Sequence, residues 1–377
     1  MFKKIPNGIT KLDKKENFSD RVLNAYCNKN DPNLSKKRNF DINANNTKDG
    51  KENISGLIGQ TTNKKQPIII SIGGGKGGIG KSFLTANIAV RLACLGFKVS
   101  AIDLDLGAAN LHTCLGIPTP VKGVSNFFQG EVETLEETGI DTHIPNLTLY
   151  GGNQDFWQHV KPQGSQKIKL INYLQELNSD YVFIDLGAGT HVHTLDFFIF
   201  SDAGLLVVVP EPTSIENAYV FMKSVIFRKI QNICRAFEIN QELENILLQK
   251  IVAPSAGSTP FAEFTKFIDN NGDIDKEIID ILKATNTGIV MNQVRTQEDK
   301  DLGLSMSSIC SQYFGFSSQF IGSMRYDDSV WKSIRIRKPL VIDYPHSVAS
   351  SNIYQITDEL IRTYEPLRKE MEFSQTG

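Results

Sequence analysis

A glycine-rich segment at residues 73–82, GGGKGGIGKS, restricts this chain more than any other feature. It follows an apolar run at residues 68–72 and precedes an amphipathic segment at residues 83–95. Glycines in such a loop let backbone N–H groups converge on phosphate oxygens, and the start of the following helix adds partial positive charge. The pattern G-x-x-x-x-G-K-[ST], here from Gly75 to Ser82, therefore predicts a strand, a phosphate-binding loop and a helix.

The charged and hydroxylic residues of this loop have distinct expected roles. Lys81 is expected to reach the β- and γ-phosphates of ATP, and the Ser82 hydroxyl is expected to ligate Mg²⁺. Lys76 is a second lysine, at a position where an ordinary phosphate-binding loop needs no charge, and a merely solvated side chain is the alternative reading. The predicted nucleotide-binding residues of the loop are Gly75, Lys76, Gly77, Gly78, Ile79, Gly80, Lys81 and Ser82.

Beyond the loop, short apolar runs alternate with helical patterns. Strands are predicted at residues 68–72, 99–103, 147–150, 181–185, 204–209, 288–292 and 320–324, and helices at 83–95, 166–178, 214–230 and 302–313. Many of the strands consist largely of Val, Ile and Leu, as in strands covered on both faces. The alternation predicts an α/β fold with a doubly wound, mostly parallel sheet flanked by helices. Ligands of such sheets bind beyond the carboxyl ends of the strands.

Aspartates end two of the predicted strands. Asp103 and Asp105 follow one strand, and Asp185 ends another. Because a Mg²⁺–nucleotide site needs a carboxylate at the end of a neighbouring strand, Asp185 is predicted to hold Mg²⁺ together with Ser82. Asp105 is predicted to position the attacking water, and Asp103 to cap or neutralise the loop lysines. The predicted catalytic residues are Lys76, Lys81 and Asp105.

These motifs together resemble those of one family. The KGGxGK[ST] loop, the DxDxGxxN segment from Asp103 to Asn110 and the DLGAG segment at 185–189 resemble the deviant phosphate-binding loop and switch segments of the MinD/ParA class of P-loop ATPases. The GAG version is similar to the FlhG/FleN branch. Three later segments, at residues 207–219, 290–294 and 322–341, also resemble segments of this family. The resemblance therefore covers about residues 66–365, except for residues 231–285.

The resemblance carries expectations for individual residues. It implies that Lys76 crosses a dimer interface to the partner's nucleotide and that Asn292 reads adenine. A buried amide can donate to and accept from the adenine edge, although an asparagine that caps a turn is the simpler alternative. Arg325 stands where the family has proline, so the pocket on the side of the base can differ in detail.

At the level of function the resemblance implies an ATP-dependent homodimer that hydrolyses ATP slowly and acts as a switch. Its expected task is spatial or numerical regulation of flagella or cell division, with an unidentified protein partner or activator. A ParA-like ATPase that partitions DNA or cargo is the first alternative, and an ATP-binding scaffold with little turnover is the second. The chain has no C-x-x-C pair, which argues against delivery of a metal cluster.

Charge is distributed unevenly along the chain. Residues 1–66 carry 14 Lys/Arg and 7 Asp/Glu, a net charge of +7, which leaves −9 of the total of −2 for the remainder. The expected organisation is a basic, disordered arm at 1–66, an ATPase domain at 67–365 with a helical insertion at about 231–285, and a polar tail at 366–377 that Pro366 interrupts. The acidic body disfavours nucleic acid as a partner, although the basic arm keeps that partner open.

The remaining signals concern the compartment. Five cysteines lie far apart, the amino terminus has no signal peptide, and no apolar run is long enough to span a membrane. A cytoplasmic protein is therefore expected. The carboxyl-terminal tail shows no convincing amphipathic anchor, so peripheral contact with the inner face of the plasma membrane stays open.

Overall fold

The computed structural model describes residues 66–105, 109–152, 164–270 and 277–375. The predicted basic arm therefore lies outside the described residues, apart from its last residue. The strands are β1 Ile68–Gly73, β2 Val99–Leu104, β3 Gly139–Asp141, β4 Leu147–Tyr150, β5 Tyr181–Leu186, β6 Ala203–Val208, β7 Asn286–Val294 and β8 Ser317–Arg325. The helices of the ATPase core are α3 Lys81–Cys94, α4 Leu111–Cys114, α5 Val124–Gln129, α6 Gly164–Glu176, α7 Val192–Phe200, α8 Pro212–Ala236, α12 Gln297–Ile309, α13 Asp328–Arg335, α14 Leu340–Asp343 and α15 Val348–Gln375.

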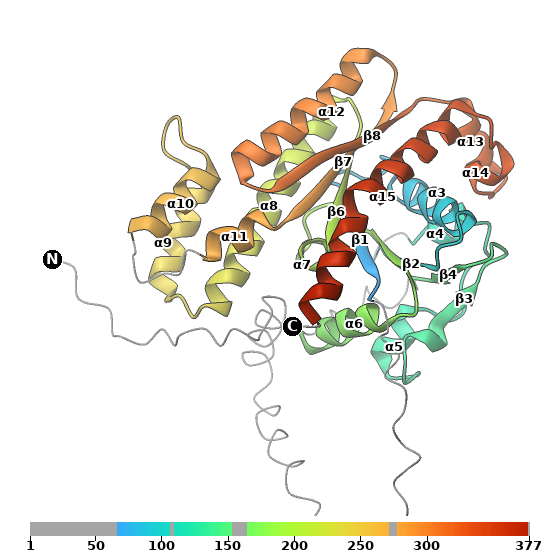
Figure 1. Cartoon of the computed structure of the whole chain (residues 1–377), viewed down its shortest axis with the longest axis horizontal. Helices are drawn as coiled ribbons and strands as arrows, with labels where there is room; N and C mark the ends of the chain where they lie inside the picture. Colours follow the sequence, from blue (N-terminus) through green and yellow to red (C-terminus); the bar gives the residue numbers. More distant parts are fainter. Residues whose placement is uncertain (1–65, 106–108, 153–163, 271–276, 376–377) are drawn as a thin grey trace, which may run out of the picture.

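The described strands form one eight-stranded sheet in the order β3-β4-β2-β5-β1-β6-β7-β8. Every neighbouring pair is parallel except β3 and β4. β1 lies between β5 and β6, so the loop that follows β1 emerges in the middle of the sheet (Figure 1). This confirms the predicted doubly wound, mostly parallel α/β fold and puts the loop where parallel sheets bind ligands.

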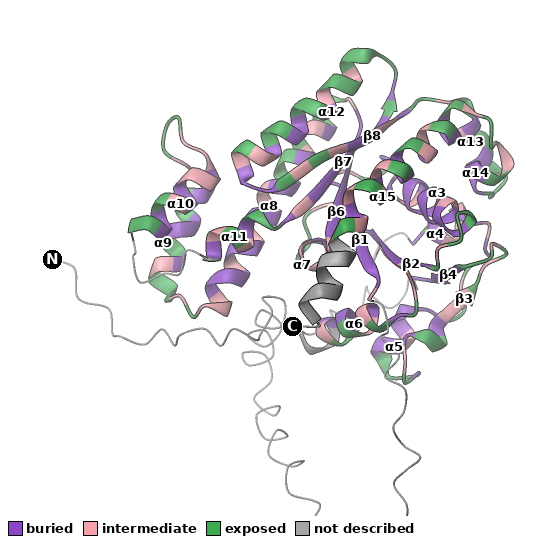
Figure 2. Ribbon diagram, viewed as in Figure 1, coloured by how far each residue is buried: buried purple, intermediate pink, exposed green. Residues whose placement is uncertain are grey.

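The sheet has a hydrophobic core on each face. Alternate residues of β1 point to opposite faces, and Ile68, Ile70 and Ile72 join the core beneath α3 and α15 while Ile69 joins the core beneath α6 to α8 and α12. Figure 2 shows the central strands as buried, while exposed residues lie on the outer sides of the helices, on connecting loops and on the edge strand β8. Burial on both faces explains why these strands are almost continuously apolar in sequence.

Three features differ from the predictions. β3 was not predicted, because its three residues contain no apolar run, and its place comes from antiparallel pairing with β4. α8 continues past Ile230 to Ala236. The predicted interruption at Pro366 is wrong, since this proline lies inside α15. A proline removes only one backbone donor, and the preceding turns are fixed by buried Ile356, Leu360 and Tyr364.

The segment between α8 and β7 is largely helical. It contains α9 Gln241–Val252, α10 Pro260–Asn270 and α11 Glu277–Lys283. These helices extend the core on the α8 side of the sheet through Leu247, Phe264 and Ile278, which are fully buried. A further short element, a π-helical turn at Cys310–Phe314, follows α12 and lies against α10, where Phe261 approaches Gly315.

Candidate functional site

The glycine-rich loop joins β1 to α3 at the carboxyl edge of the sheet. The predicted loop residues from Gly75 to Ser82 all lie on this connection or at the start of α3. A Cβ atom on Gly75 would come within 2.2 Å of the backbone oxygen of Asn217, so the loop packs tightly against the first turns of α8. Ile79 is buried in the core and anchors the loop from below. The sequence thus folds here into a backbone cradle of the kind that receives phosphate.

Lys81 and Ser82 stand at the start of α3, facing the neighbouring strand β5. Lys81 is buried, and burial lowers the pKa of its ammonium, while the carboxylates of Asp185 and Asp105 oppose that shift. The Ser82 hydroxyl lies near the Asp185 carboxylate and acts to lower the pKa of that group. The loop lysine, the loop hydroxyl and the strand-end carboxylate that were predicted from separate motifs are therefore brought together.

Asp185 has a buried carboxylate with unused capacity. Its Oδ1 accepts a hydrogen bond from the Thr85 hydroxyl at 3.3 Å, whereas its buried Oδ2 has no hydrogen-bond partner among the residues that the structure describes. Burial raises the pKa of Asp185 to about 7, against the lowering effects of Ser82 and Lys81. A buried carboxylate oxygen without a partner, beside a serine hydroxyl, is a donor set that fits Mg²⁺. We therefore assign Asp185 and Ser82 as the residues that would hold the ion.

Asp103 lies beside Asp185, because the two residues are register partners on β2 and β5. Both oxygens of Asp103 accept backbone hydrogen bonds, Oδ1 from Asp105 N at 3.0 Å and Oδ2 from Leu111 N at 3.1 Å. Burial, followed by the charge of Asp185, raises the pKa of Asp103 well above its usual value. Of its predicted roles, the structure shows capping: Asp103 fixes the two ends of the segment between Asp105 and α4.

Asp105 is half-buried and ends the described part of this segment, since residues 106–108 are not described. Its charge acts on Lys81, and its Oδ1 lies near Gly187, where an added Cβ would come within 3.1 Å. Asp105 therefore stands between the loop lysine and the DLGAG segment. This position is compatible with the predicted role of orienting a water molecule.

Asn292 is buried at the end of β7 and contacts the loop. Its Nδ2 donates to Ile79 O at 2.7 Å, and its Oδ1 accepts from Gln293 N at 2.7 Å. In this structure the amide holds the phosphate-binding loop against β7. The predicted contact with adenine would therefore have to use the remaining donor and lone pair of the amide, or follow a rearrangement of these bonds.

The contact between Asn292 and the loop makes Gly80 a sensitive position. Gly80 has φ 93°, and a Cβ there would lie 2.4 Å from the Asn292 Nδ2. We expect Gly80→Ala to weaken ATP binding by about tenfold or more, because a left-handed alanine and a steric clash together cost about 2 kcal/mol. Isothermal titration with ATP and Mg²⁺ measures this. Gly96→Ala, also at positive φ but with no atom within 4 Å of the added Cβ, is the matched control and should leave affinity unchanged.

Lys76 lies apart from the other charged residues of the loop. Its Nζ donates to the Glu211 carboxylate at 3.0 Å and to the Thr213 hydroxyl at 3.3 Å, and 39% of its side chain is exposed. The two loop lysines therefore have opposite environments: Lys81 points into the buried carboxylate cluster, and Lys76 lies at the surface beside the start of α8.

Sequence reasoning missed two residues of this site. Thr85 supplies the hydroxyl on Asp185, and its place one turn after Lys81 on α3 could have indicated that it faces the same way. Glu211 pairs with Lys76 across 135 residues of chain. Glu211 lies in the segment 207–219, which was recognised as resembling the family, but no sequence signal indicated this pairing.

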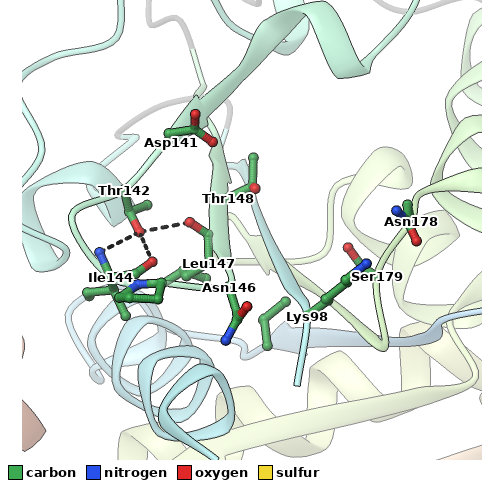
Figure 3. Close-up of a pocket in the computed structure, with 11 residues that line it drawn as sticks. Lys98, Asp141, Thr142, Ile144, Asn146, Leu147, Thr148, Asn178 and Ser179 are labelled. Carbon is green, nitrogen blue, oxygen red and sulfur yellow. Dashed lines mark hydrogen bonds between the residues drawn. The ribbon is translucent and has the colours of Figure 1, made fainter. Parts of the chain in front are cut away.

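A separate cavity lies at the opposite edge of the sheet, at the amino ends of β2 and β4. It has a volume of about 410 Å³ and is lined by residues that include Lys98, Asp141, Asn146 and Ser179 (Figure 3). The Thr142 hydroxyl there is occupied by the backbone of its own turn. None of the predicted site residues lines this cavity. We therefore place the functional site at the phosphate-binding loop.

Comparison with known proteins agrees with this placement. The family model of the CobQ/CobB/MinD/ParA nucleotide binding domain matches residues 70–340, a span that contains the loop, both aspartate-bearing strand ends and Asn292. The chain belongs to this family. It is a MinD/ParA-class P-loop ATPase related to FleN, FlhG and MinD, as the resemblance predicted.

Two relatives match this chain over different lengths. The antiactivator FleN of Pseudomonas aeruginosa is 28% identical over 284 residues, which cover 75% of this chain and 82% of FleN. The flagellum site-determining protein YlxH of Helicobacter pylori is 35% identical over 165 residues, 43% of this chain and 54% of YlxH. The chain thus matches only about half of YlxH.

Solved structures of MinD share the fold of this MinD/ParA ATPase. The cell division ATPase MinD of Pyrococcus furiosus aligns with a TM-score of 0.53 and 22% identity, covering 78% of this chain and 98% of that MinD. The septum site-determining protein MinD of Pyrococcus horikoshii, solved with Mg-ADP, aligns with a TM-score of 0.52 and 21% identity, covering 78% and 95%. Among the described helices, none combines the length and apolar character needed to cross a bilayer.

Proposed function

We propose that this protein is a slow ATPase that works as a dimerisation switch in the spatial or numerical regulation of flagella or cell division. The names of its relatives FleN, YlxH and MinD support this task. The proposal includes a cytoplasmic location with peripheral contact at the inner face of the plasma membrane. It also includes a protein partner or activator, because a MinD of related fold was solved in complex with MinC.

The observation that carries the proposal is the different placement of the two loop lysines. Lys81 is buried beside Asp185 and Asp105, where it would meet the phosphates of its own nucleotide. Lys76 is at the surface, paired only with groups at the start of α8. A surface ammonium next to a nucleotide site can reach the phosphates of a second subunit docked on that face, so bound ATP would become part of the interface.

Different residues of the chain would have different roles in ATP hydrolysis. Mg²⁺, when bound, would neutralise charge on the β- and γ-phosphates, and Ser82 and Asp185 are the residues placed to hold it. Lys81 would stabilise the charge that develops on the transferred phosphoryl group. Asp105 would orient the attacking water, and hydrolysis would then release the dimer. Asp103 would keep the Asp105 segment in position through its two backbone hydrogen bonds.

The test is the oligomeric state measured by light scattering with ATP and with ADP. The wild-type protein is expected to dimerise with ATP and to be monomeric with ADP. Lys76→Ala is expected to remain monomeric with ATP while still binding it, since the Lys76 ammonium is held by Glu211 and Thr213 in its own subunit. If Lys76→Ala dimerises as well as the wild type, the cross-interface role is wrong.

Glu211→Gln separates this role from a local one. The substitution removes the charge that holds Lys76 in the single chain but leaves the lysine itself in place. If Lys76 acts across the interface, Glu211→Gln retains ATP-dependent dimerisation. If both variants lose it equally, the Lys76–Glu211 pair acts within one chain.

A further inference from the structure

Helix α13, Asp328–Arg335, exposes two of its three apolar side chains to solvent, while the third, Val330, is half-buried against the core. Its buried residues are small and polar: Ser333 is fully buried and Ser329 is 8% exposed. Its large side chains point outward, with Trp331 59% and Ile334 43% exposed. Surface helices normally bury their apolar stripe. α13 is reversed in this respect, and the reversal indicates that its outer face meets something other than water.

The exposed apolar residues continue on both sides of α13. Tyr326 precedes the helix and Ile336 and Ile342 follow it, and each of these side chains is about half exposed. Basic residues alternate with them along the chain. We define the α13 surface as the exposed residues Arg325, Tyr326, Trp331, Lys332, Ile334, Arg335, Ile336, Arg337, Lys338 and Ile342.

The α13 surface is basic on an otherwise acidic ATPase domain. Residues 325–338 carry five Lys/Arg and two Asp, a net charge of +3, whereas residues 67–377 as a whole carry −9; one of these cations, Lys338, pairs with Asp343 at 3.5 Å. One of the two aspartates, Asp327, is engaged in the fold, where it accepts hydrogen bonds from Ser329 N and Ala349 N. The Arg335 guanidinium lies over the Trp331 ring at 5.3 Å, so charge and apolar area occupy the same place.

The fold holds this surface in a fixed position. α13 and α14 lie at the edge of the molecule, next to α3 (Figure 1). The backbone N–H of Val341 in α14 donates to Asn87 of α3, and the hydrogen bonds of Asp327 tie the start of α13 to the start of α15. Trp331 and Ile334 are therefore presented outward on a supported element, and the side of α13 that packs on the protein is occupied by Ser329, Ser333 and Val330.

We propose that the α13 surface docks on an anionic lipid bilayer. Aromatic and aliphatic side chains of such a surface enter the region between headgroups and acyl chains, and Lys and Arg beside them bind the lipid phosphates. Nucleic acid shares those phosphates, but isoleucines at three exposed positions gain little from a sugar–phosphate backbone. This deepens the proposed function, on which it rests for the membrane as a partner, by naming the surface and the class of lipid.

Fluorescence can report this contact at one residue. The chain has two tryptophans, so a Trp157→Phe background leaves Trp331 as the single reporter. With vesicles of phosphatidylglycerol mixed with phosphatidylcholine, we expect a blue shift of Trp331 emission and co-sedimentation of the full-length protein. Vesicles of phosphatidylcholine alone are expected to bind far more weakly. The measurement is made without nucleotide, so its failure is separate from failure of the ATP-dependent dimerisation test.

Two variants and one matched control complete the experiment. Lys332→Glu/Arg335→Glu is expected to lower the affinity for the anionic vesicles at least tenfold, at roughly a fewfold per basic residue, and Trp331→Ser/Ile334→Ser is expected to lower it comparably. Ile309→Ser, at a 53% exposed apolar residue of α12, should leave it unchanged. An unshifted Trp331 emission, equal binding by the variants, or binding of duplex DNA in place of vesicles would overturn the proposal.

Discussion

Asp185→Asn is expected to make the nucleotide-free protein more stable at mildly alkaline pH. Burial raises the pKa of Asp185 from 3.8 to about 7, so the folded protein holds a proton on this group that the unfolded chain has released. The stabilising contribution is therefore complete below pH 3.8 and is lost as the pH rises through about 7. Above that pH the wild type keeps a buried charge, and the amide removes a cost of roughly 2 kcal/mol or more.

The same substitution should abolish activity, because the amide offers Mg²⁺ no negative charge. We expect at least a hundredfold loss of ATP hydrolysis, a rough figure typical of removing one electrostatic group from a reacting phosphate. Thermal unfolding at mildly acidic and mildly alkaline pH and a phosphate-release assay measure the two effects. Asp202→Asn is the matched control, since burial raises its pKa to about 6 but its carboxylate accepts from Ile69 N, near the start of β1 and away from the loop.

The control should change stability and keep ATP hydrolysis. Equal stability of Asp185→Asn and wild type at alkaline pH would contradict the buried charge. Hydrolysis by Asp185→Asn at the wild-type rate would contradict its place in the Mg²⁺ site.

Lys229→Met is expected to stabilise the protein. Lys229 lies on α8 and is 5% exposed, and its ammonium donates to the Thr285 hydroxyl. Burial lowers its pKa from 10.5 to about 7, so the unfolded chain binds a proton that the folded protein lacks between these values. Wild-type stability therefore falls as the pH drops from 10.5 to about 7. Methionine fills similar space without a charge, and we expect a gain of roughly 2 to 4 kcal/mol near neutral pH.

Denaturant unfolding near neutral pH and near pH 10 measures this gain, which should be smaller at the higher pH because neutral lysine is the less costly form. Lys250→Met, on the exposed side of α9, is the matched control and should change stability by less than about 0.5 kcal/mol. A Lys229→Met protein that unfolds more easily than wild type would show that the ammonium has an important partner.

The parts of the structure that depend on short sequence patterns were predictable. The strand before the loop, the loop itself and the start of α3 follow from apolar residues and glycines that are adjacent in sequence. The sheet follows from strands that are apolar on both faces. β3 and the continuation of α15 through Pro366 were not predictable in this way, since pairing and packing decide them.

The site was predictable as a set of residues but not as a set of contacts. Asp103 and Asp185 were both predicted at strand ends, yet only the pairing of β2 with β5 puts them side by side. The hydrogen bonds around them then distinguish the two carboxylates. Backbone N–H groups donate to both oxygens of Asp103, whereas one oxygen of Asp185 accepts no hydrogen bond from the described residues. The bond between Asn292 and Ile79 and the pair between Lys76 and Glu211 join segments more than 100 residues apart. No local pattern encodes such partners.

Helix α8 links the phosphate-binding loop to helices α9 and α11. It has 25 residues, a length of about 37 Å, with its only proline at the first position and no glycine. Its first turn follows Glu211 and packs on the loop, while its last turns bear Lys229 and lie against α9 and α11. A helix without proline or glycine in its interior has no residue that favours a kink, so its two ends move together. A one-residue insertion in the middle of α8 would turn the distal helices by about 100° relative to the loop. An insertion after Ala236 would leave α8 itself unchanged.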